Sequence, residues 1–186
     1  DRDRNAVSLT YTLEDSYGSK IVVPGAGFLL NNEMGDFNAG PGLTDLKGLI
    51  GTEPNLARPG KRMLSSMTPT ILAKDGDLSM VIGSPGGRTI INTVLLNILN
   101  VVDFKMNIQD AIDFPRFHHQ WLPDRISYEK NGISPDTLAL LQQRGHTVEE
   151  SRYYQGFAAG IVWNREEKFI EGGIDRRALD GAAIGR

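Results

Sequence analysis

The stretch from Ser79 to Val102 restricts the possible folds more than any other part of the chain. Residues 79–83, SMVIG, form a short apolar run typical of a buried strand. From Thr89 to Val102 the apolar residues recur at helical spacing and leave an almost fully apolar surface. The sequence GSPGG joins the two runs. The stretch therefore predicts a strand, a tight glycine turn and a buried helix.

The glycine turn is also the first candidate for chemistry. Gly86 and Gly87 can bring bare backbone N–H groups close to a ligand at the positive end of the helix, which suits an oxyanion. The turn is not a phosphate loop of the Walker type, because no lysine-serine pair closes it. It is not a nucleophile elbow, because Pro85 stands at the serine position. Taken alone, the glycines are more typical of a plain strand-to-helix turn than of an anion site.

The other patterns mix strands and helices. Ala6 to Leu13 alternates, with Val7, Leu9, Tyr11 and Leu13 on the apolar face, and predicts a half-buried strand. Further expected elements are a hairpin over residues 21–23 and 28–30, a strand after Pro69, a strand over Phe157 to Trp163, and a helix from Ser134 to Gly145. Since strands and helices do not alternate regularly, the pattern favours an α+β fold over a doubly wound one.

Length and composition limit the classes of function. A chain of 186 residues that is 40% hydrophobic predicts a single domain over residues 1–186. The net charge of −3, with no massed lysine and arginine, makes nucleic acid an unexpected partner. No stretch approaches the ~18 to 20 consecutive apolar residues of a membrane span. The absence of cysteine excludes disulfides, thiolate metal sites and a cysteine nucleophile, but leaves the compartment open.

Four polar residues near the start of the chain predict a cation site. Glu14 shares a strand face with Thr12 if the strand continues, and Glu33 and Asp36 follow the next apolar run. Three carboxylates around one point repel each other unless a cation lies among them, and a substrate ammonium is the obvious one. The alternative is that each acid is separately solvated.

Hydroxyl and imidazole side chains supply two more candidates. Ser65 and Ser66 can grip a carboxylate through their hydroxyl and amide groups, or simply form a turn. His118 and His119 are adjacent, so their side chains diverge, and no third ligand stands at metal spacing. We therefore interpret both histidines as structural.

Five long blocks then point to one family. The blocks are NAVSLTYTLEDSYGSKIV, GFLLNNEMGDF, KRMLSSMTPTIL, GSPGGRTIINTVL and PRFHHQWLPD. In this order they resemble the signature blocks of the small subunit of bacterial γ-glutamyltranspeptidases, also called glutathione hydrolases, and the resemblance extends from Asp1 to the C-terminal DGAAIGR. It implies an N-terminal nucleophile hydrolase of αββα sandwich architecture. The resemblance also implies that one precursor cleaves itself into a small subunit, to which this chain corresponds, and a large subunit that completes the fold.

The resemblance also implies an activity and residue roles. The activity is γ-glutamyl transfer to water or an amino acid through an acyl-enzyme, with no cofactor and no metal, in the periplasm or a secreted location. By matching position, Glu14, Glu33 and Asp36 resemble the residues that hold the α-ammonium, and Ser65 with Ser66 the pair that binds the α-carboxylate. The catalytic matches are Gly86 and Gly87 as the oxyanion hole and Thr12 as the second threonine that supports the nucleophile.

The chain departs from the family pattern in three places. Several members carry asparagine and glutamine where Glu14 and Glu33 stand, so this pocket is more acidic than theirs. The segment from Gly40 to Gly60 has the length of the lid loop, with Lys47 at the place of a tyrosine. The short TTH-like run that carries the family's nucleophilic threonine does not precede Asp1, so we expect this chain to lack the nucleophile.

Three other functions remain alternatives. A non-catalytic relative would keep the pocket as a γ-glutamyl-binding module, although an oxyanion loop would then have little purpose. A glutaryl or cephalosporin-type acylase acts on substrates without the ammonium that three acids would serve. A poly-γ-glutamate depolymerase is the third, and a loop of lid length argues against long polymers.

Overall fold

The computed structural model describes residues 1, 3–178 and 180–185, which divide into two units. The larger unit contains Asp1–Thr10, Met67–His119 and Arg125–Arg186, and the smaller contains Tyr11–Ser66 and Gln120–Asp124. Each unit is described by itself below. The single domain expected from the chain length stays a prediction.

A four-stranded antiparallel sheet forms the centre of the larger unit. Its strands lie in the order β1-β2-β6-β7 and comprise β1 (Thr70–Lys74), β2 (Asp77–Gly83), β6 (Ala159–Asn164) and β7 (Phe169–Ile174). The turn between β1 and β2 places Asp75 and Gly76 at φ 55° and 84°, the left-handed pair that a tight hairpin needs. The strands predicted after Pro69, over residues 79–83 and before Trp163 are confirmed.

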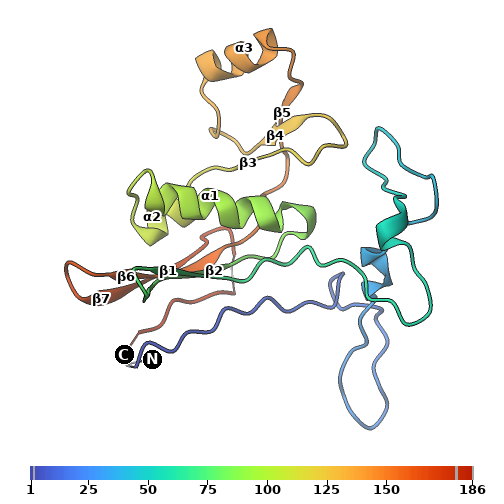
Figure 1. Cartoon of the computed structure of the whole chain (residues 1–186), viewed down its shortest axis with the longest axis horizontal. Helices are drawn as coiled ribbons and strands as arrows, with labels where there is room; N and C mark the ends of the chain where they lie inside the picture. Colours follow the sequence, from blue (N-terminus) through green and yellow to red (C-terminus); the bar gives the residue numbers. More distant parts are fainter. Residues whose placement is uncertain (2, 179, 186) are drawn as a thin grey trace. The chain divides into compact units, whose positions relative to one another are not determined.

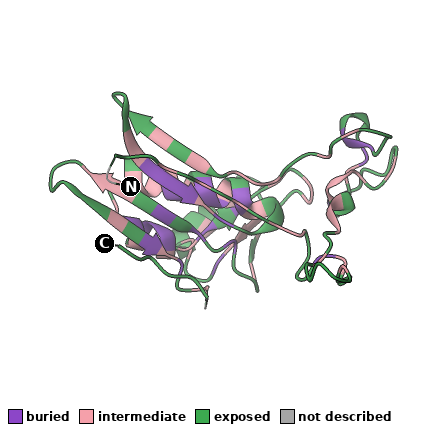
Figure 2. Ribbon diagram, turned by 90° about the horizontal axis from the view of Figure 1, so that it is seen from below, coloured by how far each residue is buried: buried purple, intermediate pink, exposed green. Residues whose placement is uncertain are grey.

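Two helices cover one face of this sheet (Figure 1). They are α1 (Ile90–Val102), entered through the 3-10 turn η3 (Gly87–Thr89), and α2 (Ile108–Asp113). The core between the layers consists of Met80, Ile82, Val94, Ile108, Ile112 and Ala158, and Figure 2 shows the buried residues gathered where helices and sheet meet. The predicted strand, glycine turn and helix are thus confirmed, but the helix is buried on one face only, since Ile91, Leu95 and Val102 are 45 to 56% exposed. The helix packs one apolar face against the sheet, because removing apolar surface from water stabilises the folded state.

A small second sheet and one more helix complete the larger unit. The strands β3 (Phe117–His118), β4 (Ile126–Tyr128) and β5 (Val148–Glu150) pair in the order β3-β4-β5. The helix α3 (Pro135–Gln143) begins at Ser134, whose hydroxyl oxygen accepts the amide of Thr137, and has proline at its first position. The helix predicted from Ser134 is confirmed. No helix among the described residues is long and apolar enough to cross a membrane.

The predicted strand over Ala6–Leu13 is wrong in two respects. The segment is extended but pairs with no strand, and no described residue forms a backbone hydrogen bond with residues 6–12. Its faces are also reversed, because Val7, Leu9 and Tyr11 are 84%, 77% and 81% exposed while the polar residues between them are half-buried. The physical reason is that the polar face lies against the central sheet. The N-terminal segment runs along the side of the sheet away from α1 (Figure 1). There the Ser8 hydroxyl donates to the carbonyl oxygen of Ile82 in β2 at 2.9 Å.

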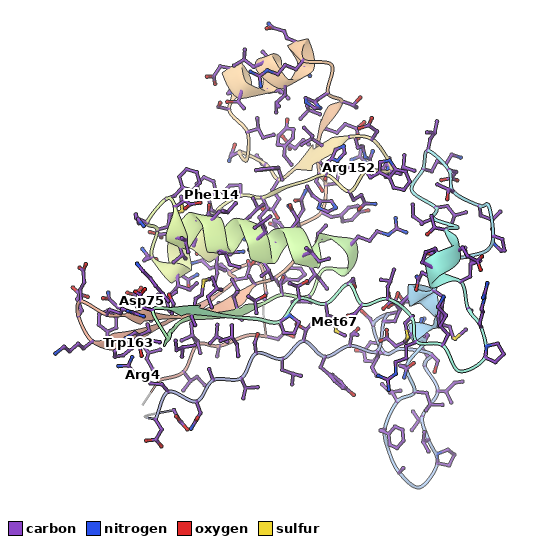
Figure 3. All side chains as sticks on the ribbon, viewed as in Figure 1. Arg4, Met67, Asp75, Phe114, Arg152 and Trp163 are labelled. Atoms are coloured by element: carbon purple, nitrogen blue, oxygen red, sulfur yellow. The ribbon has the colours of Figure 1, made fainter. Side chains whose placement is uncertain are left out.

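A cation–π contact fixes the start of this segment. The guanidinium carbon of Arg4 lies 4.0 Å from the centre of the Trp163 ring, as the adjacent labels in Figure 3 indicate. Trp163 belongs to β6, so the contact ties the N-terminal segment to the central sheet within the larger unit.

The smaller unit consists mainly of loops. It contains two 3-10 turns, η1 (Glu33–Asp36) and η2 (Glu53–Asn55). The expected hairpin is confirmed as a short antiparallel pairing. Val22 and Leu29 form a bridge, and Val23 donates to Phe28 and Leu30 to Ile21, each at 2.9 Å. The long loop expected between Asn38 and Gly60 is confirmed, since only η2 and a bridge from Asn38 to Leu56 interrupt it.

Candidate functional site

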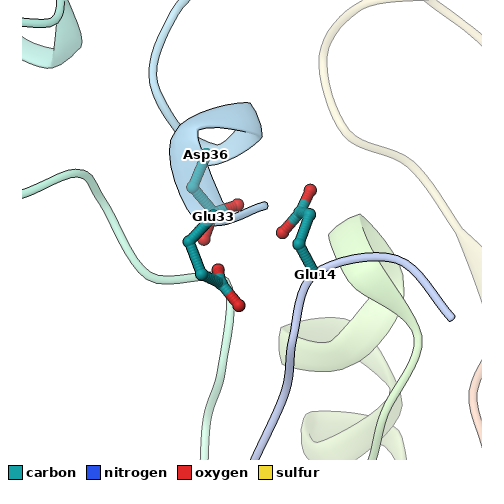
Figure 4. Close-up of side chains that lie close together, drawn as sticks. All are labelled: Glu14, Glu33 and Asp36. Atoms are coloured by element: carbon teal, nitrogen blue, oxygen red, sulfur yellow. The ribbon is translucent and has the colours of Figure 1, made fainter. Parts of the chain in front are cut away.

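The three acids predicted to converge do so in the smaller unit. Glu33 and Asp36 stand at the two ends of η1, and Glu14 approaches from the segment that faces this turn (Figure 4). One carboxylate oxygen from each lies within 4.8 Å of the others. Gly35 leaves room for this arrangement, because a Cβ there would lie 3.1 Å from a Glu14 carboxylate oxygen. The acids are therefore a cluster and not three separately solvated side chains.

The route by which Glu14 joins the cluster differs from the prediction. It does not share a strand face with Thr12, because Glu14 has a left-handed φ of 76° and the extended segment turns at this point. The backbone N–H of Glu14 instead donates to the Thr12 hydroxyl oxygen at 2.8 Å. Thr12 thus caps the turn that aims Glu14 at the other acids.

Two asparagines that sequence analysis passed over hold the acids in place. The Asn31 side-chain oxygen accepts the backbone N–H of Glu33 at 3.1 Å. Asn32 accepts the amide of Asp15 at 3.2 Å and donates to the Asp15 carboxylate at 3.0 Å, which links η1 to the residue after Glu14. The signal was present, since asparagine before a short turn commonly bonds to nearby backbone. Nothing in the sequence indicated the contact from Asn32 to Asp15.

The cluster is electrostatically strained in the absence of a cation. Partial desolvation, with the negative charges of Asp36 and Glu33 beside it, raises the pKa of Glu14 above its usual value. Partial desolvation and the charge of Asp36 likewise raise the pKa of Glu33. A cation among these oxygens would relieve the repulsion, whether it is an ammonium group or a hard metal ion that prefers oxygen ligands.

The strain predicts that a substitution at Glu33 stabilises the protein. A raised pKa means that the folded protein disfavours the ionised carboxylate, so a stability cost is present above the folded pKa and absent below the unfolded value of about 4.3. We expect Glu33→Gln to raise the melting temperature near neutral pH without ligand, and the gain to vanish as the pH falls toward about 4. Thermal unfolding across this pH range checks it, with the exposed Glu166→Gln as the control. A loss of stability at neutral pH would contradict the repulsion.

The serine pair lies in the same unit, and a buried asparagine ties it to the acids. The Asn55 side chain donates to the carbonyl oxygen of Asp36 at 2.7 Å and accepts the amide of Leu64 at 2.9 Å. Leu64 precedes Ser65, which is exposed, and Ser66, which is half-buried. One buried amide side chain therefore sets the backbone of both an acid and the residue next to the serines.

The two glycines of the turn have backbone conformations that other residues rarely adopt. Gly86 has φ 144° and Gly87 φ 54°, both in the region that favours glycine. Both residues are exposed, and among the described residues neither amide donates to a backbone oxygen. A Cβ on Gly87 would meet nothing within 4 Å, whereas one on Gly86 would lie 2.7 Å from the Thr89 hydroxyl and 3.0 Å from the Gly156 Cα. The two amides are free to bind an oxyanion, and Gly86 is the more constrained glycine.

Sequence analysis missed a buried ionic network in the larger unit. Arg116, 2% exposed, pairs with the fully buried Asp175 at 2.6 Å. Arg177 bridges Asp175 at 3.0 Å and the buried Glu129 at 2.9 Å. Burial alone would raise the pKa of Asp175, but hydrogen bonds from Arg116 and Arg177 hold it below its usual value. Two cations and two anions thus neutralise each other inside the protein, as buried charges require.

The two adjacent histidines differ in burial. His118 is buried in β3, whereas His119 is exposed just beyond that strand. Among the described residues, the one group of three acids or imidazoles close enough to share a metal ion is Glu14, Glu33 and Asp36.

Comparisons with known proteins agree on one family. The family model for gamma-glutamyltranspeptidase matches residues 1–185. The glutathione hydrolase proenzyme of Escherichia coli (strain K12) is 52% identical over 185 residues, which are 100% of this chain and 31% of that protein. Among solved structures, an acivicin-inhibited gamma-glutamyltranspeptidase superposes with a TM-score of 0.89 at 45% identity, and covers 96% of each chain. Gamma-glutamyltranspeptidase from Pseudomonas nitroreducens complexed with L-DON gives 0.87 at 40% identity, over 100% of this chain and 96% of that one.

These similarities confirm the fold class. The mixed helices and sheets are those of the N-terminal nucleophile hydrolases to which the matched structures belong. The chain spans about a third of the length of the curated relatives it matches, 31% in the Escherichia coli protein.

Proposed function

Because the chain belongs to the gamma-glutamyltranspeptidase family, we propose that it is the small-subunit part of an enzyme that transfers the γ-glutamyl group of glutathione and related amides to water or an amino acid. The observation that carries the proposal is the convergence of Glu14, Glu33 and Asp36 within 4.8 Å. Their mutual repulsion is relieved by a bound cation, and the α-ammonium of a γ-glutamyl substrate is a cation of the right kind.

The other groups of the substrate find matching chemistry. The hydroxyls of Ser65 and Ser66 are donors for the α-carboxylate, and the backbone joined by Asn55 keeps the serines and Asp36 in a fixed relation. An ammonium and a carboxylate on the same carbon are thus recognised by acids and hydroxyls of one unit. A glutaryl group has no ammonium, so the acid cluster would serve no purpose in an acylase specific for it.

The reaction requires stabilisation of a negative oxygen. In the proposed mechanism a threonine hydroxyl, activated by its own α-amine, attacks the γ-carbonyl carbon, and the carbonyl oxygen becomes an oxyanion. The free amides of Gly86 and Gly87 are the donors for this oxygen. The amide C–N bond then breaks, the amine leaves with a proton, and water or an amino acid takes the γ-glutamyl group from the ester. Thr12 is proposed as the supporting threonine, and the nucleophile itself is not assigned to any residue of this chain.

A partner subunit follows from the exposed N-terminal segment. The outward face of Val7, Leu9 and Tyr11 is apolar, and no described residue forms backbone hydrogen bonds with residues 6–12. An extended, alternating segment with open edges is suited to pairing with strands of another chain. We assign this role to a large subunit from the same precursor, since the curated relatives are about three times as long. On the family resemblance alone, we also propose a periplasmic or secreted location.

The test is hydrolysis by the full precursor that contains this chain. We expect the purified, self-cleaved protein to hydrolyse a γ-glutamyl anilide and to form a covalent γ-glutamyl adduct that mass spectrometry detects on a threonine. A glutaryl anilide and poly-γ-glutamate should be poor substrates. Preference for the glutaryl compound would favour an acylase, preference for the polymer a depolymerase, and binding of γ-glutamyl amides without turnover a non-catalytic relative.

A further inference from the structure

We propose that residues 155–158 are a positioning platform for the glycine turn, and that Gly156 and the side chains that hold this platform determine the turnover of the enzyme without touching the substrate. The inference rests on the proposed function, because it takes the amides of Gly86 and Gly87 as the oxyanion donors. The platform lies in the larger unit with the glycine turn, between β5 and β6.

Arg116 and Asp175 hold the platform from one side. One guanidinium nitrogen of Arg116 donates to the carbonyl oxygens of Gln155 at 3.1 Å and Gly156 at 2.9 Å. The other donates to the Asp175 carboxylate at 2.6 Å, and the same carboxylate oxygen accepts the amide of Ala158 at 3.1 Å. The buried ion pair therefore contacts three of the four platform residues through their backbone.

Neutral groups and a second acid hold the remaining backbone atoms. The amide of Gln155 donates to the Glu129 carboxylate at 2.7 Å, and the carbonyl oxygen of Gln155 accepts the Thr93 hydroxyl at 2.8 Å. The amide of Phe157 donates to the Ser84 hydroxyl oxygen at 3.1 Å. This segment belongs to no helix or strand, yet side chains bond to three of its amides and to two of its carbonyl oxygens. Such a network specifies one conformation, because any shift leaves a buried polar group unpaired.

The platform packs against the glycine turn with no room for a side chain on Gly156 or on Gly86. Gly156 is buried, has φ 82°, and a Cβ on it would lie 2.7 Å from the Ser84 hydroxyl and 2.9 Å from the carbonyl oxygen of Pro85. From the other side, a Cβ on Gly86 would lie 3.0 Å from the Gly156 Cα. Glycine on both sides therefore permits direct backbone contact, so a displacement of the platform moves the turn.

The turn depends on this contact for its orientation. Gly86 and Gly87 are exposed. Among the described residues, the carbonyl oxygen of Gly86 accepts the Thr89 amide at 3.1 Å and the Thr89 hydroxyl at 2.9 Å, and that of Gly87 accepts the Ile90 amide. The Ser84 hydroxyl donates to the carbonyl oxygen of Pro85 at 2.7 Å, so these bonds hold the carbonyl groups of the turn and leave the direction of its two glycine amides to the packing behind it. Oxyanion donors stabilise a transition state only when their direction is set before the reaction. A rigid buried segment behind an exposed turn supplies that direction, and it acts on the rate step and not on substrate binding.

The decisive experiment compares Gly156→Ala with Gly145→Ala in the full self-cleaving precursor. The two glycines have similar φ, 82° and 88°, but a Cβ on Gly145 would meet nothing within 4 Å. Both substitutions therefore carry similar backbone strain, and only the first pushes on the turn. We expect Gly156→Ala to lower kcat for a γ-glutamyl anilide about 10- to 100-fold with KM within about twofold. Gly145→Ala should leave both constants near the wild-type values.

A tetrahedral inhibitor gives a second readout that loss of stability does not mimic. A boronic acid analogue of the γ-glutamyl group mimics the oxyanion, so its affinity should fall with kcat in Gly156→Ala, whereas the affinity for a non-reacting γ-glutamyl amide should not. If Gly156→Ala does not fold, Thr93→Val decides, because it removes the hydroxyl that donates to the carbonyl oxygen of Gln155 with little change of volume, and Thr93 lies outside the turn. It should lower kcat in the same way.

The outcomes separate the two proposals. An active wild-type enzyme in which the folded variants keep their kcat and boronate affinity overturns the platform. An inactive wild-type precursor overturns the proposed function, and with it the platform as a determinant of turnover.

Discussion

Replacing Asp36 with alanine is expected to raise KM for a γ-glutamyl anilide by about 30- to 700-fold. A charged contact of this kind contributes about 2 to 4 kcal/mol of binding, and each 1.4 kcal/mol is about a tenfold change. Of the three acids, Asp36 is the one whose replacement tests ammonium binding best. Its negative charge acts on both other acids and raises the pKa of Glu14 and of Glu33, so its removal changes the electrostatics of the whole cluster. Steady-state kinetics on the self-cleaved precursor measures the effect.

A substrate without the ammonium provides the internal control. Glutaryl anilide has the same scissile amide, so Asp36→Ala should leave its KM unchanged or lower it by removing a negative charge from the pocket. If both substrates lost affinity equally, the acid would be a structural residue of η1 and not the ammonium ligand.

Replacing Gly86 with alanine is expected to lower turnover about 10²- to 10³-fold while KM changes little. The new methyl group would lie 2.7 Å from the Thr89 hydroxyl and 3.0 Å from the Gly156 Cα, so the turn must move to admit it. This movement takes an amide away from the oxyanion, and the expected loss of turnover is that of one oxyanion donor. Left-handed strain alone is tested by Gly76→Ala, since Gly76 has φ 84° in the turn between β1 and β2 and open space around it. An unchanged kcat in a folded Gly86→Ala enzyme would make the loop a packing turn.

Hydrophobic period, glycine and helix-capping residues correctly predicted those elements of the fold that depend on their own sequence. The strand over residues 79–83, the glycine turn and the helix up to Val102 follow from period and from the absence of a side chain on glycine, and all three are present. The helix that begins at Ser134 follows from a capping hydroxyl and a proline. Each of these signals lies within the element that it describes.

The N-terminal segment shows where such patterns fail. Alternation indicates that Val7, Leu9 and Tyr11 share a face, which is correct, but it does not indicate what covers that face. Burial was expected because apolar faces are usually buried within the same chain. In the structure the polar face turns inward, and the Ser8 hydroxyl bonds to β2.

The residues of the candidate site were predictable from the sequence, but the side-chain contacts that hold them in place were not. The acids and the glycines stand in recognisable blocks, whereas the buried pair of Arg116 and Asp175 joins residues 59 positions apart with no local signal. Asn55 likewise bonds across the loop to Asp36, which is 19 positions away. Contacts at such separations depend on the folded topology, which a linear pattern does not contain.

The exposed apolar face of Val7, Leu9 and Tyr11 has a practical consequence when this chain is produced by itself. The stretch VSLTYTL has no charge, no proline and no glycine, is rich in β-branched and aromatic residues, and has unpaired backbone at residues 7–12. Segments of this composition stack into intermolecular sheets when they are left open. We therefore expect the isolated chain to self-associate and precipitate with rising concentration, and lysine at Leu9, whose side chain is 77% exposed, to keep it in solution.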